Sequence, residues 1–218
     1  MKHVGDITKI RGYDVEPVNV IIGGSPCQDL SIAGRRAGLG GERSGLFMDQ
    51  IRVIKEMRII DAIIRGRTGK DIRPRFMVWE NVPGAFSSNK GADFGAVLQE
   101  TARIIVKESP ALSVPKKGWP TAGCIAGMGD GGVEFSIAWR VFDAQFWGVP
   151  QRRRRIALVA DFGGLSAPEI LFERESVSGD HAPCRTPKET VTAYVENRAV
   201  ADDSVLAAGF NGWKESDH

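Results

Sequence analysis

The chain has 218 residues, a net charge of +2, and ordinary apolar (42%) and charged (26%) fractions. These values exclude wholesale disorder and predict one α/β core rather than two full domains. No apolar run approaches the roughly 18 residues of a membrane helix, and the N-terminus lacks a signal-peptide core, so we expect a cytoplasmic protein without a membrane partner. Three widely spaced cysteines predict neither a disulfide framework nor a metal site.

Apolar patterns predict alternating strands and helices along the first three quarters of the chain. In chain order we expect a strand at 18–22, a helix from Gly45 to near Gly66, a strand at 75–79, a helix at 93–108, and strands at 135–142 and 156–160. Residues 109–132, rich in Gly, Pro and Lys, are expected to form an irregular insertion. This order predicts a mostly parallel, doubly wound sheet with helices on both faces.

A cysteine follows the first predicted strand, in Gly23-Gly-Ser-Pro-Cys-Gln-Asp-Leu-Ser31. The strand ends of α/β folds commonly carry their chemistry, so Cys27 is a candidate nucleophile. A small buried apolar cysteine is an equally good interpretation of this segment alone. The Gly- and Arg-rich residues 31–44 that follow are expected to form a mobile loop.

Two further polar groups lie next to predicted strands. Glu80 directly follows the strand expected at 75–79. It is either a solvated carboxylate or an acid that acts on a ring nitrogen of the substrate. Gln151-Arg-Arg-Arg-Arg155 precedes the last strand, so Arg153 and Arg155 are expected on one side and Arg152 and Arg154 on the other. This block is either a general basic run or a pair of arginines that holds an anionic substrate.

Three of these segments together resemble a known family. The Pro-Cys-Gln segment, Glu80-Asn81-Val82 and Gln151-Arg-Arg-Arg-Arg155 stand in the order and spacing of three motifs of the DNA cytosine-5 methyltransferase family, of bacterial and phage type. Gly45-Leu-Phe also matches the start of the helix that follows the catalytic loop of that family. The resemblance covers residues 4–162 and implies a partial methyltransferase fold of the Rossmann-like kind.

The resemblance implies roles for residues that the patterns alone leave open. The target cytosine would leave the DNA duplex, Cys27 would add to its C6 atom, and Glu80 would contact its N3 atom and exocyclic amine. Arg153 and Arg155 would complete the catalytic set. The expected contacts to the cytosine or to double-stranded DNA are Gln28, Ser31, Asn81 and Gln151.

The resemblance also implies S-adenosylmethionine as the cofactor, with Asp6, Pro26 and Leu46 as its expected contacts. The Phe-x-Gly-x-Gly loop of the family has no counterpart before Asp6, and its Gly-Asn-Ser/Ala-Val motif has none after Trp213. We therefore expect residues 1–165 to form a partial catalytic core and residues 166–218 to form a linker and the possible start of a recognition domain. We expect such a fragment to bind the cofactor poorly, to expose a sheet edge, and to need a complementing chain.

Two alternatives stay open at this point. One is an RNA cytosine-5 methyltransferase, because that branch shares the same motifs. The other is a catalytically incomplete DNA-binding partner of a split methyltransferase. A covalent adduct with substrate that depends on Cys27 would separate the enzymes from the binding partner.

Overall fold

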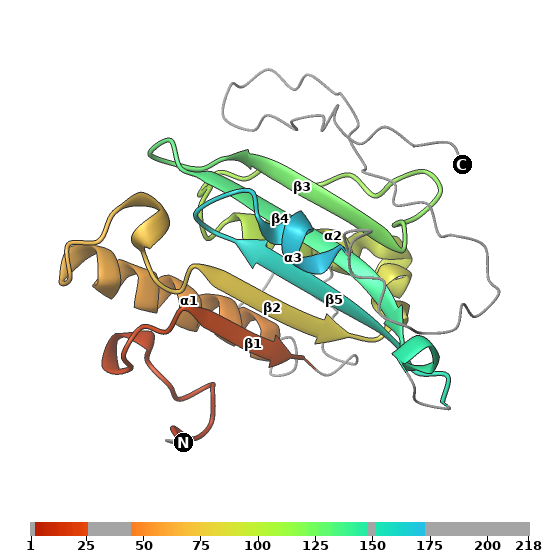
Figure 1. The fold of residues 1–218 in the computed structure, drawn as a ribbon, viewed down its shortest axis with the longest axis horizontal. Helices are drawn as coiled ribbons and strands as arrows, with labels where there is room; N and C mark the ends of the chain where they lie inside the picture. The colour runs from red at the N-terminus through yellow and green to blue at the C-terminus, as the bar shows by residue number, and fades with distance from the viewer. Residues whose placement is uncertain (1–2, 26–44, 148–150, 173–218) are drawn as a thin grey trace.

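The computed structural model describes residues 3–25, 45–147 and 151–172, and these fold around one five-stranded sheet (Figure 1). The strands are β1 (Val20–Gly24), β2 (Phe76–Asn81), β3 (Ala122–Met128), β4 (Glu134–Asp143) and β5 (Arg154–Asp161). The helices are α1 (Gly45–Ile63), α2 (Ala92–Ala102) and α3 (Ala167–Leu171). The order of strands across the sheet is β1-β2-β5-β4-β3.

The sheet is mixed, so the prediction of a mostly parallel sheet is wrong. Only β1 and β2 are parallel, whereas β2–β5, β5–β4 and β4–β3 are antiparallel pairs. Short connections explain the difference, because a parallel crossover needs about a dozen residues or more, usually with a helix. The β3–β4 connection turns at Gly131 and Gly132, which have φ angles of +82° and +76°. The β4–β5 connection is also too short for a crossover helix.

Strand β3 lies inside the segment that we expected to be irregular. Most residues of β3 are small, and they show little alternation of apolar and polar side chains. Gly123 lies against the ring of Trp139 on β4. A Cβ atom at Gly123 would come within 2.4 Å of that ring, so a glycine is required where the indole crosses the strand. The turn sequence Gly129-Asp-Gly-Gly132 between two apolar segments is a hairpin signal that predicts this pair of strands.

Helices cover both faces of the sheet, as predicted. Figure 1 shows α1 and α2 behind the sheet and α3 in front of it. The face behind carries the larger core, in which Trp79 and Trp139 are each at most 1% exposed. Phe94 contacts both tryptophans, and Phe47 contacts Trp79, in edge-to-face or tilted geometry. On the front face Ala167 and Leu171 of α3 pack against β4 and β5. Residues 173–218 lie outside the described part, so the domain division at residue 165 stays a prediction.

Both long helices were predicted, but each ends earlier than expected. The expected apolar stripe of α1 is buried from Phe47 to Met57, whereas Ile64 lies beyond the helix and is 71% exposed. Arg58 and Asp61 are buried on this helix instead, at 8% and 0% exposure. Helix α2 ends at Ala102, and a turn then continues to Val106.

Strand β1 lies at the edge of the described sheet and pairs only with β2. Val20 and Ile22 on its outer face are 43% and 74% exposed. This agrees with the expectation of an exposed strand edge with apolar surface. Among the described helices, none is long and apolar enough to cross a membrane.

Candidate active site at the ends of β1 and β2

The candidate site lies where the parallel strands β1 and β2 end together. The register pairs Gly24 with Glu80, so the chain leaves β1 next to the Glu80 carboxylate. The expected nucleophile Cys27 follows three residues after Gly24, and it lies outside the described residues together with Pro26, Gln28 and Ser31. The described part of the site therefore consists of the residues around Gly24 and Ser25, which precede Cys27 in the chain.

Buried hydrogen bonds hold the last described residue before Cys27. Asn81 is 3% exposed, and its Nδ2 atom donates to the carbonyl oxygen of Ser25 at 2.9 Å. The indole N–H of Trp79 donates to the Ser25 hydroxyl at 3.1 Å. The Asn81 Oδ1 atom accepts the backbone N–H of Val82 at 2.8 Å. The described contacts of Asn81 are thus contacts within the protein that fix the end of β1 against β2.

Ser25 and Trp79 are site residues that the sequence analysis missed. Alternation along β2 could have found Trp79, because it places Trp79 and Asn81 on the same face, opposite Glu80. Ser25 has no such signal, since its role depends on the pairing of β1 with β2.

We predict that Asn81→Ala lowers the free energy of unfolding by about 1–3 kcal/mol, because it leaves the Ser25 carbonyl and the Val82 N–H without their partner. Urea denaturation measures the loss, with Asn19→Ala as the control because the Asn19 side chain is exposed. An equal effect of the two substitutions would contradict a role of Asn81 in joining the strand ends.

Glu80 faces away from the main core and forms an ion pair with Arg155. The Nε atom of Arg155 lies 2.7 Å from Oε1 of Glu80, and the two side chains are 32% and 49% exposed. Arg155 also donates from Nη1 to the carbonyl oxygen of Arg154 at 2.8 Å. On the other side of Glu80, a Cβ atom at Gly24 would come within 3.2 Å of Oε2. The carboxylate therefore lies between Gly24, the last residue of β1, and Arg155, the second residue of β5.

The antiparallel pairing of β2 with β5 creates this ion pair. Glu80 pairs with Ala157, so the first residues of β5 lie beside the last residues of β2. In a mostly parallel sheet, residues that precede a strand would lie at the opposite end from Glu80. The observed strand direction is thus the feature that brings the arginine block to the acid.

The remaining residues of the arginine block do not share this contact. Arg153 precedes β5 and is exposed, and its backbone N–H donates to Oδ1 of Asp143 at 3.2 Å. Gln151, Arg152 and Arg154 are exposed as well. Within the described residues, Arg155 is the member of the predicted set that the structure brings to Glu80.

The expected cofactor contacts Asp6 and Leu46 lie near the N-terminal half of α1. Asp6 is exposed, and hydrogen bonds from the backbone and hydroxyl of Thr8 (3.0 and 2.9 Å) lower the pKa of its carboxyl group. Arg52 of α1 donates to the carbonyl oxygen of Ile7 at 2.9 Å and thereby joins the Asp6 turn to the helix that begins next to Leu46. In the described residues, no group of three or more His, Cys, Asp or Glu side chains could hold a metal ion.

A carboxylate and a guanidinium thus lie together at the end of β2, beside the end of β1, and Cys27 follows β1 three residues later in the sequence. Comparison with known proteins agrees with the resemblance of the motifs. Residues 1–104 match the family model described as C-5 cytosine-specific DNA methylase. This match supports the assignment of the chain to the C-5 cytosine-specific DNA methylase family.

Methyltransferases from bacteria and from a phage are among the proteins that are similar to this chain. The chain is 35% identical to a DNA N-6-adenine-methyltransferase of Escherichia phage P1, over 94% of this chain and 28% of that protein. It is 27% identical to the Type II methyltransferase M.BsuFI of Bacillus subtilis, over 78% of this chain and 31% of the relative. It is 30% identical to the DNA (cytosine-5-)-methyltransferase M.ApeKI of Aeropyrum pernix, over 71% and 28% of the two chains. The chain thus spans less than a third of the length of these relatives.

Proposed function

We propose that this chain carries the cytosine-attacking edge of a DNA cytosine-5 methyltransferase. The observation that carries the proposal is the Glu80–Arg155 ion pair at 2.7 Å, beside the strand end that leads to Cys27. The family match supports the same chemistry. A double-stranded DNA substrate is favoured over RNA because the named relatives are DNA methyltransferases.

The proposed reaction begins with a cytosine that has left the base stack, since its C6 atom is unreachable inside the duplex. The Cys27 thiolate donates an electron pair to C6 and forms an S–C6 bond. Glu80 holds N3 and the exocyclic amine, and so stabilises the electron density that makes C5 nucleophilic. S-adenosylmethionine, when bound, would supply the methyl group for C5 and would leave as S-adenosylhomocysteine, whose sulfur keeps the electron pair of the broken S–CH3 bond. Loss of the C5 proton then returns an electron pair to the ring, breaks the S–C6 bond and releases the Cys27 thiolate.

Arg155 is proposed to position Glu80 through their ion pair and to contact the flipped nucleotide. Arg153, Gln151, Gln28 and Ser31 are proposed contacts to the base or the neighbouring phosphates, in keeping with their exposure or their place in the motifs. Asn81 is proposed to act through Ser25, by holding the start of the loop that carries Cys27.

The described cofactor residues fit one end of S-adenosylmethionine. Asp6 offers an exposed acceptor for an amine, and the half-buried Leu46 offers an apolar contact for a ring. We propose that these two residues and Pro26 hold the adenine end of the cofactor. The Thr8 hydrogen bonds keep the Asp6 carboxylate ionised and oriented for that contact.

The edge of β1 supports the proposal of a complementing chain. Val20 and Ile22 are exposed on this strand, and its outer backbone groups have no strand partner in the described residues. The named relatives are more than three times as long as the part that aligns with this chain. We propose that a strand from the remainder of such an enzyme, supplied by a separate polypeptide, pairs with β1.

Adenine methylation is the second candidate, because the phage P1 relative carries that name. It would place the methyl group on an exocyclic amine and would give Cys27 no bond to make. The Pro-Cys-Gln and Glu-Asn-Val segments therefore favour the cytosine reaction.

A trapping experiment tests the proposed function. The 218-residue chain is incubated with S-adenosylmethionine and a DNA duplex that contains 5-fluorocytosine. The experiment has two arms, one without and one with a complementing polypeptide that co-elutes with the chain in gel filtration. The complement carries the parts of M.BsuFI that lie outside the alignment. We expect a covalent protein–DNA adduct, stronger with the complement, because fluorine at C5 prevents the final proton loss.

The adduct must disappear in Cys27→Ala and persist in Cys124→Ala, since Cys124 lies on β3, away from the site. Mass spectrometry of nucleosides from an unmodified duplex is expected to show 5-methylcytosine. Absence of the adduct in both arms would overturn the proposal that Cys27 is the nucleophile. N6-methyladenine as the product would favour adenine methylation.

A further inference from the structure

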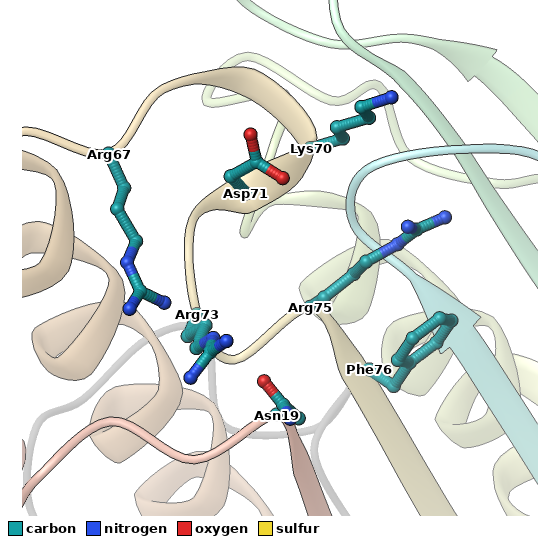
Figure 2. A pocket seen from close by; sticks show the side chains of 7 residues that line it. All are labelled: Asn19, Arg67, Lys70, Asp71, Arg73, Arg75 and Phe76. Atoms are coloured by element: carbon teal, nitrogen blue, oxygen red, sulfur yellow. The ribbon is translucent and has the colours of Figure 1, made fainter.

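A cavity of about 450 Å³ lies at the N-terminal ends of β1 and β2, at the opposite end of the sheet from Glu80 (Figure 2). The side chains that line it are mostly cationic, and we call it the basic pocket: Asn19, Arg67, Lys70, Asp71, Arg73, Arg75 and Phe76. From Phe76 to Asn81, β2 spans about 17 Å at roughly 3.3 Å per residue. The basic pocket is therefore separate from the candidate active site.

The loop that carries these cations is fixed by buried polar groups of α1. Arg58 donates from Nη1 to the carbonyl oxygens of Ile72 (3.0 Å) and Pro74 (2.6 Å). Burial lowers the pKa of Arg58 to about 10, which leaves it cationic at neutral pH. The Oδ2 atom of Asp61, which is 0% exposed, accepts the backbone N–H of Arg73 at 2.7 Å. The loop therefore presents its side chains from a preformed backbone.

Two further contacts fix the floor of the basic pocket. The carbonyl oxygen of Asn19 accepts the backbone N–H groups of Arg75 (3.1 Å) and Phe76 (3.0 Å). The Arg75 guanidinium stacks 4.9 Å from the centre of the Phe76 ring and donates to both oxygens of Asp161. The charge of Arg75 is thus neutralised by Asp161, and its side chain forms part of the wall of the basic pocket.

The other cationic side chains of the basic pocket have fewer carboxylate partners than Arg75. Arg67 lies 3.7 Å from Asp61, a carboxylate that already accepts the Arg73 N–H. Within the part of the chain that the structure describes, no ion pair involves Lys70 or Arg73. Asp71 is the one carboxylate among the lining residues, so the pocket keeps an excess of positive charge. Figure 2 shows the guanidinium groups of Arg67 and Arg73 on the same side of the loop, with Asn19 below them.

We propose that the basic pocket binds the phosphate group of a small ligand, with Arg67 and Arg73 as its donors. Each guanidinium group can give phosphate two parallel hydrogen bonds, whereas the Lys70 amine points away from the two arginines and adds only positive charge. The volume admits a ligand of nucleotide size, and the Asn19 amide can accept or donate a further hydrogen bond. A DNA backbone engaged at Glu80 would lie at the other end of the sheet, which favours a free nucleotide over duplex DNA as the source of the phosphate.

Titration calorimetry of the full 218-residue chain tests this proposal with inorganic phosphate, adenosine monophosphate and a short DNA duplex as separate probes. We expect saturable binding of phosphate and of the nucleotide at one site per chain. The double substitution Arg67→Gln with Arg73→Gln is expected to weaken both by about tenfold or more, through the loss of charge-assisted hydrogen bonds.

The matched control is Lys116→Gln with Lys117→Gln, which removes the same charge from exposed positions on another loop. It should change binding by less than about twofold, because exposed charges at a distance are screened. Thermal unfolding of both double variants checks that the scaffold is intact. Equal weakening in the two, or no saturable binding of phosphate or nucleotide, would overturn the proposal. Duplex DNA that competes with the nucleotide and shows the same dependence on Arg67 and Arg73 would overturn the proposal that the phosphate belongs to a small ligand.

Discussion

Replacing Glu80 by Gln is expected to slow adduct formation with 5-fluorocytosine DNA by about 10²–10⁴-fold, the range that a positioned acid or base contributes. The amide keeps the shape of the side chain but loses the charge that pairs with Arg155 at 2.7 Å. It also loses the capacity to hold or release a proton at N3. The rate is measured in the arm of the trapping experiment that yields the adduct.

A matched control for this prediction is Glu134→Gln. Glu134 is an exposed acid at the start of β4, far from β1, and its substitution should leave the rate unchanged. The pair of variants Arg155→Lys and Arg155→Gln separates charge from geometry. If Arg155 positions Glu80, the Lys variant should recover part of the rate that the Gln variant loses, at similar DNA affinity. Equal rates for Glu80→Gln and the wild type would remove Glu80 from the reaction.

The largest expected loss of stability follows from Asp161→Ala. Asp161 is 0% exposed, lies at the end of β5, and accepts hydrogen bonds from Arg75 at 2.8 and 2.9 Å and from the backbone of Gly163 at 3.0 Å. The Ser166 hydroxyl donates to it as well. Arg75 is 33% exposed and stays partly solvated without Asp161, so the loss of the buried carboxylate should cost about 3 kcal/mol, below the full cost of breaking a wholly buried pair. This is a large share of the 5–15 kcal/mol that a domain of this size has.

Urea denaturation at neutral pH measures this loss, with Asp14→Ala as the control. Asp14 and Arg11 form an ion pair in which both side chains are more than half exposed (57% and 72%), so its loss should cost no more than about 1 kcal/mol. Asp161→Asn, Arg75→Gln and the double variant that combines them complete the cycle with less severe substitutions than Asp161→Ala. A cost for Asp161→Ala no larger than that of Asp14→Ala would show that the pair does not stabilise the fold.

The same carboxylate should make the stability depend on pH. Burial alone would raise the pKa of Asp161, but hydrogen bonds from Arg75, Ser166 and Gly163 outweigh it and lower the pKa below its ordinary value. A carboxylate with a depressed pKa stabilises the fold above the pKa of the unfolded chain, about 3.9. That contribution is lost as the pH falls through the folded-state pKa. The wild type should therefore lose more stability than Asp161→Asn on acidification below about pH 4.

The local patterns of the sequence were enough to predict most of the elements. Four predicted strands correspond to β1, β2, β4 and β5, and both long helices form where the apolar spacing indicated. The burial of Arg58 and Asp61 near the end of α1 was not predicted, because they contact a loop that the periodicity of α1 does not encode. β3 was missed because its small residues, such as Gly123, are required by the Trp139 ring of the neighbouring strand.

The motifs of the sequence indicated the family and the candidate residues Cys27 and Glu80, and they located the arginine block in the chain. The tertiary structure alone decided which arginine reaches the acid, because the antiparallel pairing of β2 with β5 brings residues 75 positions apart into contact. It also decided that Asn81 turns inward to Ser25 while Glu80 turns outward. Strand direction and pairing depend on connections and long-range packing, so local sequence patterns do not specify them.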